Sequence, residues 1–269
     1  MRFIAPALVL LVAAFLLPLL YVVYLSFGGS SPSLEKYAAI ATEPLYRQVL
    51  LNSVYISVVS TGLTLLLGYP IAYHLEAQPP RRRTVLMILV LMPFWTSILV
   101  KSFAFTVILG KSGIINSFLQ WATGMEGHLP MLFNRFGVVV GMTHFLLPFM
   151  VFTVLASLLT QGPELRRAAN VMGATRLTIF WRIIFPLSLP GVMAGILICM
   201  IMSMAMFITP ALLGGRGDLM ISNLVEFHVR DTLDWEMASA LAVCLLAITG
   251  VFCIGIARVR GGQLFGEEG

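Results

Sequence analysis

The chain has 269 residues, of which 59% are hydrophobic and only 11% are charged. Its mean hydropathy is +0.94. A soluble globule of this length needs more polar surface, so the composition excludes a water-soluble fold and predicts an all-α integral membrane protein.

The apolar residues group into about six segments that are long enough to cross a bilayer, which takes roughly 20 residues each. The predicted spans are 3–27, 51–73, 84–109, 136–159, 187–213 and 237–257. The first is expected to stay uncleaved, because its apolar run is too long for a signal peptide and no small-x-small site follows it. Lys101 interrupts the third, which either continues to Leu109 or ends near Val100, with a separate outer helix over 102–109. Without linkers or repeats, we predict one transmembrane domain over 1–269.

Basic residues predict how these spans are oriented. If both termini, the 81–83 turn and the loop at 161–187 share one side, that side carries ten basic residues against seven on the other. The ten are Arg2, Arg81, Arg82, Arg83, Arg166, Arg167, Arg176, Arg182, Arg258 and Arg260. The excess places this side, with both termini, in the cytoplasm. The net charge of +5 therefore reports topology and not a nucleic-acid surface.

The loop at 161–187 is polar but patterned. Apolar residues recur at helical spacing twice, first at Leu165, Ala168, Ala169 and Met172, then at Leu177, Phe180, Trp181 and Ile184. Pro163 suits a first helical position, Gly173 suits the left-handed residue past a helix end, and Thr175 suits a cap. We predict two short amphipathic helices, hinged at Gly173 and Ala174, that dock onto another surface.

The same loop resembles the EAA loop of ABC importer permeases, in which Glu-Ala-Ala precedes a Gly and a later Leu-Pro. Ala168, Ala169, Gly173 and Pro186 fall in register, whereas Arg167 replaces the usual Glu and Phe185 the usual Leu. Three other segments look like the spermidine/putrescine-type branch of these permeases. They are Pro93-Phe94-Trp95-Thr96-Ser97, Leu147-Pro148-Phe149-Met150 and Leu213-Gly214-Gly215. The resemblance runs from about Leu51 to Ala240.

The resemblance implies a type I ABC importer permease fold in the bacterial inner membrane. The chain would form half of the path for a small polar solute, with a polyamine such as spermidine or putrescine as the best match. It also implies a second homologous permease, two ATPase subunits that bind ATP and Mg²⁺, and a periplasmic substrate-binding protein. The loop would couple to the ATPase through Glu164, Leu165, Arg167, Ala168, Ala169, Met172, Gly173, Ala174 and Pro186.

Other functions remain open from the sequence. The same branch resembles carriers for ferric iron, sulfur oxyanions, opines and phosphonates, and no residue decides among them. An ATP-independent channel or secondary carrier is a further alternative, with the basic loop lying flat on anionic lipid.

The sequence offers no catalytic chemistry. Gly110-Lys111-Ser112 imitates the end of a phosphate-binding loop, but Phe105 stands where its first glycine is required. The histidines and the three cysteines show no metal-ligand spacing. We therefore expect no cofactor or metal on this chain, and ATP hydrolysis on a separate subunit.

Five residues are candidates for the substrate path. They are Trp95, His144, Phe207, Glu226 and Asp234. His144 would lie near mid-membrane, where it either lines the path or bonds a neighbouring helix. The aromatic face of Trp95 suits an alkylammonium group, although an interfacial or packing role fits it too. Phe207 is a candidate gate. The acidic residues of the last outer loop would attract a cationic ligand, dock a binding protein, or simply face solvent.

Overall fold

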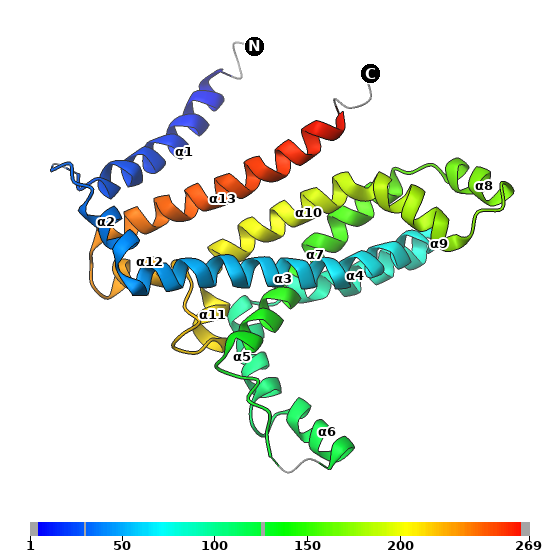
Figure 1. Ribbon diagram of the computed structural model, residues 1–269, viewed down its shortest axis with the longest axis horizontal. Coiled ribbons are helices and arrows are strands. Elements are labelled where there is room, and N and C mark those ends of the chain that lie inside the picture. Colours follow the sequence, from blue (N-terminus) through cyan, green and yellow to red (C-terminus); the bar gives the residue numbers. More distant parts are fainter. Residues whose placement is uncertain (1–4, 30, 125–126, 265–269) are drawn as a thin grey trace.

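The computed structural model describes residues 5–29, 31–124 and 127–264, and every regular element in these ranges is a helix (Figure 1). In chain order they are α1 (Ala5–Ser26), α2 (Glu35–Thr42), α3 (Pro44–Glu76), α4 (Pro80–Trp95), α5 (Ile98–Leu109), α6 (Ile114–Thr123), α7 (Arg135–Leu159), α8 (Pro163–Val171), α9 (Arg176–Ile179), the π-helical turn η1 (Phe180–Ile184), α10 (Phe185–Ala205), α11 (Ile208–Leu213), α12 (Ile221–Arg230) and α13 (Trp235–Leu264). The prediction of an all-α fold is confirmed.

Three long helices form the centre of the molecule. Helix α7 packs along both α3 and α10, and these two also contact each other. Small residues make this possible, since a Cβ atom at Gly191 or Gly195 of α10 would collide with Thr153 of α7. Helix α13 packs on α10 and α12, and α1 lies against α13.

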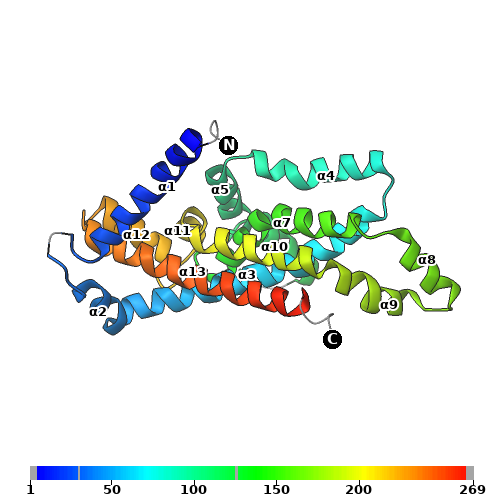
Figure 2. The same ribbon diagram turned by 90° about the horizontal axis from the view of Figure 1, so that it is seen from above.

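The two ends of the bundle carry different short helices. Helices α2 and α12 lie at one end, while α8 and α9 lie at the opposite end in both views (Figures 1 and 2). The turn that joins α3 to α4 belongs to the end with α8, because Glu76 of α3 pairs with Arg166 of α8 at 2.9 Å. The excess of basic residues predicts that this end is cytoplasmic. Arg2, one of the ten basic residues on which that prediction rests, lies outside the described ranges.

The number of spans is close to the prediction. Five described segments are long and apolar enough to cross a membrane: Pro44–Glu76, Ile98–Thr123, Arg135–Leu159, Arg176–Ala205 and Trp235–Ile256. A shorter apolar helix, Val12–Ser26, covers most of the predicted first span. The segment Ile98–Thr123 consists of two helices, α5 and α6, so it is no straight rod.

The third predicted span is wrong in its boundary. It breaks after Trp95 and resumes as α5 at Ile98, rather than ending near Val100. The cause is Pro93, which cannot donate a backbone hydrogen bond and so weakens the last turn of α4. The freed Pro93 carbonyl accepts hydrogen bonds from the Thr96 hydroxyl at 2.7 Å and from Lys101 Nζ at 2.9 Å. Lys101 therefore caps the C-terminal end of α4 through its ammonium group.

The fifth predicted span, 187–213, also proves to be two helices. Helix α10 ends at Ala205, Met206 is extended, and α11 begins at Ile208. Side chains of α12 satisfy the exposed backbone, since Ser222 donates to the Met206 carbonyl at 2.6 Å and Asn223 to the Phe207 carbonyl at 2.8 Å. Irregular backbone at membrane depth is tolerated where protein groups satisfy it in this way.

Candidate functional site

The polar loop folds back on itself at the end of the bundle, as its turn residues predict. Pro163 occupies the first turn of α8. Gly173 follows the helix with a φ of +77°, and its N–H donates to the Asn170 carbonyl at 3.0 Å. The Ala174 N–H reaches the Ala169 carbonyl at 3.0 Å. The predicted left-handed hinge at Gly173 is confirmed.

The second half of the loop differs from the prediction. Thr175 caps α9 as expected, because its hydroxyl accepts from the Thr178 N–H at 3.3 Å. Helix α9, however, runs through η1 into α10 without interruption. The second amphipathic helix is therefore the first part of the long helix α10.

The apolar face predicted for docking is divided between two surfaces. Ala169 is only 3% exposed and belongs to the buried cluster that also holds Ile179. It cannot enter a groove on a partner, which corrects the prediction for this residue. Leu165 and Met172 are 53% and 80% exposed. Ala168 is exposed as well.

The most exposed apolar residue of the loop was missed. Val171 is 89% exposed, beside Met172 and, across the Gly173 turn, Leu177 at 69%. Val171 lies off the helical stripe of α8, so periodicity does not select it. The remaining predicted coupling residues, Glu164, Arg167 and Pro186, are exposed, and Ala174 is partly buried against the core. Their role at a partner surface stays a prediction.

Two arginines tie this end of the molecule together. Arg83, in the first turn of α4, donates to the carbonyls of Leu75 and Glu76 at 3.1 and 2.9 Å and so caps α3. Arg166 of α8 pairs with the Glu76 carboxylate, and both side chains are largely buried. Helices α3, α4 and α8 thus meet at Glu76. The sequence shows both arginines only as charge: Glu76 lies 90 positions from Arg166, and the direction of the Arg83 side chain depends on how α4 turns back on α3.

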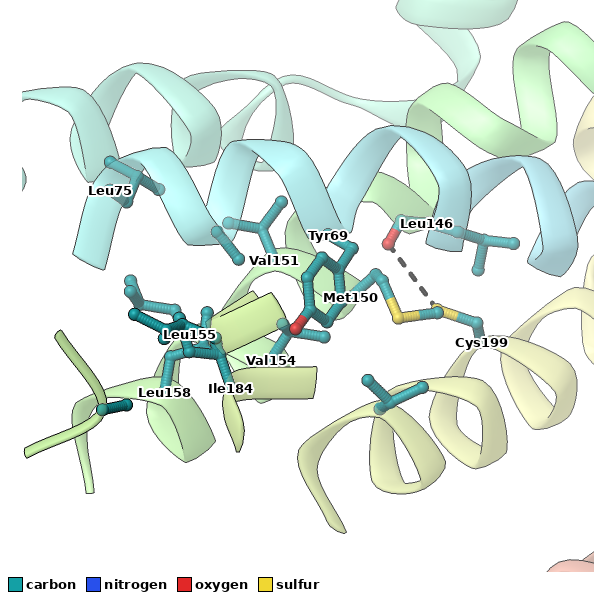
Figure 3. Close-up of a cluster of buried hydrophobic side chains, with 14 residues drawn as sticks. Tyr69, Leu75, Leu146, Met150, Val151, Val154, Leu155, Leu158, Ile184 and Cys199 are labelled. Atoms are coloured by element: carbon teal, nitrogen blue, oxygen red, sulfur yellow. Dashed lines mark hydrogen bonds between the residues drawn. The ribbon is translucent and has the colours of Figure 1, made fainter. Parts of the chain in front are cut away.

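An aromatic cluster fastens η1 to α3. The Phe180 ring lies edge-on to Tyr69 and Tyr73, with centroids 5.8 and 5.6 Å apart. The Tyr69 hydroxyl is 2.9 Å from the hydroxyl of Ser188 in α10. Figure 3 shows Tyr69 of α3 above Val154 of α7, with Ile184 of η1 beside Leu155 and Leu158. Apolar and aromatic packing therefore connects the loop to all three central helices.

Of the three cysteines, Cys199 is buried and acts as a packing residue. Cys199 of α10 is fully buried, and its thiol points to the Leu146 carbonyl of α7 at 3.8 Å (Figure 3). In the described ranges, no three His, Cys, Asp or Glu side chains come close enough to hold a metal ion.

The predicted path residues do not gather at one place. Trp95 is 70% exposed at the end of α4, whereas the His144 ring of α7 lies 5.2 Å from Phe105 of α5. Phe207 stands at the break between α10 and α11. Their role in a substrate path stays a prediction.

The two acidic candidates are engaged within the chain. Glu226 pairs with Arg230 one turn along α12 at 3.3 Å. Asp234 caps α13 by accepting from the Met237 N–H at 2.9 Å, and it pairs with Lys36 of α2 at 2.9 Å. Asp234 therefore has a structural task, and its carboxylate is not free for a cation.

This pair perturbs the titration of both groups. Burial raises the pKa of Asp234, but hydrogen bonds from the Met237 N–H and the Lys36 ammonium outweigh it, and the pKa falls below its usual value. The hydrogen bond to Asp234 raises the pKa of Lys36, against a smaller lowering by burial. Both shifts favour the charged pair.

The broken helix α4–α5 forms an aromatic surface with α7. Phe94 lies edge-on to Phe149 with centroids 5.6 Å apart, and the Lys101 ammonium lies 5.3 Å from the centre of the Phe145 ring. Together with the exposed Trp95, these rings offer π faces beside a fixed cation.

A bundle of long apolar helices with a helical loop at one end is the architecture of a multi-pass membrane protein. The chain belongs to the family of binding-protein-dependent transport system inner membrane components, whose pattern matches residues 64–259. It is accordingly an ABC importer permease of the inner membrane with a type I fold. The resemblance stated from the sequence is confirmed.

Known relatives agree with this assignment. The chain is 33% identical over 222 residues to the spermidine/putrescine transport system permease protein PotB of Escherichia coli (strain K12), covering 82% of this chain and 80% of that one. It is 28% identical to the molybdenum transport system permease protein ModB of Mycobacterium tuberculosis (strain ATCC 25618 / H37Rv), covering 82% of each.

Solved structures share the fold. A chain of a bacterial ABC transporter involved in the import of the acidic polysaccharide alginate superposes with a TM-score of 0.72 at 18% identity, covering 96% of this chain and 93% of that one. A chain of the MetNI methionine ABC transporter gives 0.58 at 15% identity, covering 81% and 97%.

Proposed function

We propose that this chain forms half of the translocation path of an ATP-driven importer and that its cargo is a polyamine. The observation that carries the proposal is the 33% identity, over 82% of the chain, to permeases named for spermidine and putrescine. ATP and Mg²⁺ would be held by two ATPase subunits. A second homologous permease would complete the path, and a periplasmic binding protein would deliver the solute.

The loop at the end of the bundle supports the coupling part of this proposal. Its tip carries Val171, Met172 and Leu177, all more than two-thirds exposed. Apolar tips of this kind are stable in a complex when a groove on another protein covers them. Because α9 continues into α10 through η1, a displacement of the tip would tilt a membrane helix and expose the path alternately to each side.

The aromatic surface near the α4–α5 break supports a cationic cargo. The two acidic candidates for the path, Glu226 and Asp234, are paired within the chain, so attraction for an alkylammonium group at the α4–α5 break would come from ring faces such as Trp95. Such contacts contribute about 0.5 to 2 kcal/mol each, depending on how far the cation is desolvated.

An oxyanion is the second candidate cargo. Lys101 places a positive charge at the break, where it would attract an anion and repel a polyamine. The 28% identity to a molybdenum transport permease points the same way.

Isolation of the tagged chain from its own membranes in mild detergent tests the proposal. We expect an ATPase subunit to accompany it, and ATP hydrolysis to rise when spermidine-loaded binding protein is added. If molybdate-loaded binding protein stimulated hydrolysis and spermidine-loaded binding protein did not, the cargo would be an oxyanion and not a polyamine. A chain that emerges alone, without hydrolysis, would favour an ATP-independent channel or carrier.

A further inference from the structure

A groove runs between α3 and α4 near the end that carries α8. Its volume is about 440 Å³, and its walls are formed by Pro70, Ile71 and Leu75 on α3 and by Leu86, Leu89 and Val90 on α4. No residue of α4 is fully buried; the helix lies at the edge of the bundle (Figure 2) and packs only partly against the central cluster, through residues such as Leu86 and Val90. The groove is thus an apolar cleft that no described part of the chain fills.

One end of this groove is cationic and polar. Arg82 precedes Leu86 by four residues and Leu89 by seven, so it lies on the face of α4 that lines the groove. On the α3 side, His74 lines the groove, and its Nε2 atom is 3.3 Å from Gln78 Nε2. Arg82 is exposed and, among described residues, pairs with no carboxylate.

Arg83 differs from Arg82 in having internal hydrogen-bond partners. It lies next to Arg82, yet its guanidinium is committed to three carbonyls at the end of α3. Glu76, the carboxylate at this corner, is occupied by Arg166. The charge of Arg82 is therefore left without an internal partner at the mouth of an apolar cleft.

We propose that this cleft binds an anionic phospholipid of the cytoplasmic leaflet, with an acyl chain between α3 and α4 and the phosphate at Arg82. Apolar walls match the chain, and the guanidinium matches the phosphate oxygens. A helix of another protein would fill the walls but would leave the charge at the mouth unexplained. The proposal rests on the cytoplasmic orientation of this end and is independent of the cargo.

The test uses the purified transporter complex in nanodiscs made of equal parts phosphatidylglycerol and phosphatidylcholine. After extraction into detergent, native mass spectrometry measures how much of each lipid remains bound. We expect phosphatidylglycerol to be retained preferentially, and Arg82→Gln to reduce its retention about fivefold. Arg81→Gln is the matched control, because consecutive residues of a helix point about 100° apart and Arg81 is therefore off the face that carries Arg82, Leu86 and Leu89; it should leave retention unchanged.

A second pair of variants tests the apolar part. Leu89→Trp should fill the groove and displace the lipid, whereas Ile88→Trp, one position off the lining face, should not. Addition of inorganic phosphate should displace nothing, since a free anion lacks the acyl chain. Equal effects of Arg81→Gln and Arg82→Gln, displacement by phosphate alone, or equal retention of the two lipids would overturn the proposal. Cross-linking of a Leu89→Cys variant to the other permease would also overturn it.

Discussion

At the scale of single residues, Gly173 is the position where a substitution should separate hydrolysis from transport. Its φ of +77° costs a side-chain-bearing residue about 1–2 kcal/mol, and a β-branched one more. No atom lies within 4 Å of the position a Cβ would take, so the backbone and not crowding decides the outcome. Gly173→Val should re-aim α8 and reduce uptake per ATP hydrolysed.

Gly173→Asn provides the control, because asparagine tolerates the left-handed conformation. It should retain most of the coupling. The measurement is the ratio of solute transported to ATP hydrolysed in proteoliposomes, with membrane insertion checked in parallel. Normal coupling in the valine variant would contradict the role of this loop as a lever.

Trp95 tests the aromatic account of cargo binding. Trp95→Ala should raise the spermidine concentration for half-maximal uptake by about two- to thirtyfold, since one cation–π contact is lost. Trp95→Phe should recover part of this loss. Trp121→Ala, which changes an even more exposed tryptophan on α6, should have no effect. An unchanged response to Trp95→Ala would remove this residue from the path.

Residue-scale features were predicted unevenly from the sequence. The hinge at Gly173 and the cap at Thr175 were predictable because both depend on neighbours within a few positions. Spacing also identified the stripe through Leu165 and Ala169 on α8. It could not show that Ala169 faces the chain's own core, because that depends on where α8 docks.

At the scale of elements, the pair between Glu76 and Arg166 joins α8 to α3. Both side chains are largely buried, so Arg166→Gln leaves a carboxylate without its partner. We expect a loss of about 1–2 kcal/mol, between the values for surface and for fully buried pairs. Thermal unfolding of the detergent-solubilised complex measures it.

The double variant Glu76→Arg with Arg166→Glu restores the pair in reverse. It should be more stable than the sum of the two single changes predicts. Additive losses would mean that α8 is held by its apolar contacts alone.

The contact between α2 and α13 should depend on pH through Asp234 and Lys36. The pKa of Asp234 is lowered by folding, so its contribution is present above about pH 4, its unfolded pKa, and is lost as pH falls through the folded value. The pKa of Lys36 is raised, so its contribution is present below about pH 10 and is lost at higher pH.

Asp234→Asn should therefore destabilise the protein by about 1 kcal/mol at neutral pH and have little effect in acid. Asparagine can still cap α13, which isolates the charge. Thermal unfolding at the two pH values measures the difference. A loss of equal size in acid would show that the cap, and not the ion pair, is what Asp234 contributes.

Helix breaks were the elements that the sequence predicted least well. Pro93 signals an interruption, but the gap at Thr96 and Ser97 depends on Lys101 reaching back to the Pro93 carbonyl. The break after Ala205 depends on Ser222 and Asn223, which approach from α12. Local hydropathy carries no information on either contact. It therefore does not place the break of the third span after Trp95, and it predicts the span 187–213 as continuous where the chain is not.

At the scale of the whole molecule, composition and basic-residue bias were sufficient for a multi-pass membrane protein, and short motifs were sufficient for the permease family. The central arrangement of α3, α7 and α10 was not predictable, because it depends on contacts such as those of Gly191 and Gly195 with α7. The path residues also remain scattered in one chain, as expected if a second permease completes the path.

ATP-dependent spermidine uptake into proteoliposomes tests the central claim most directly. One set of vesicles would contain the complete complex, and a control set would contain the same subunits without this chain. Spermidine-loaded binding protein would be supplied on the outer side of both. We predict accumulation only when ATP reaches the side of the membrane that bears α8 and only when this chain is present. Accumulation without ATP, or equal accumulation without the chain, would contradict the claim that it forms half of an ATP-driven path.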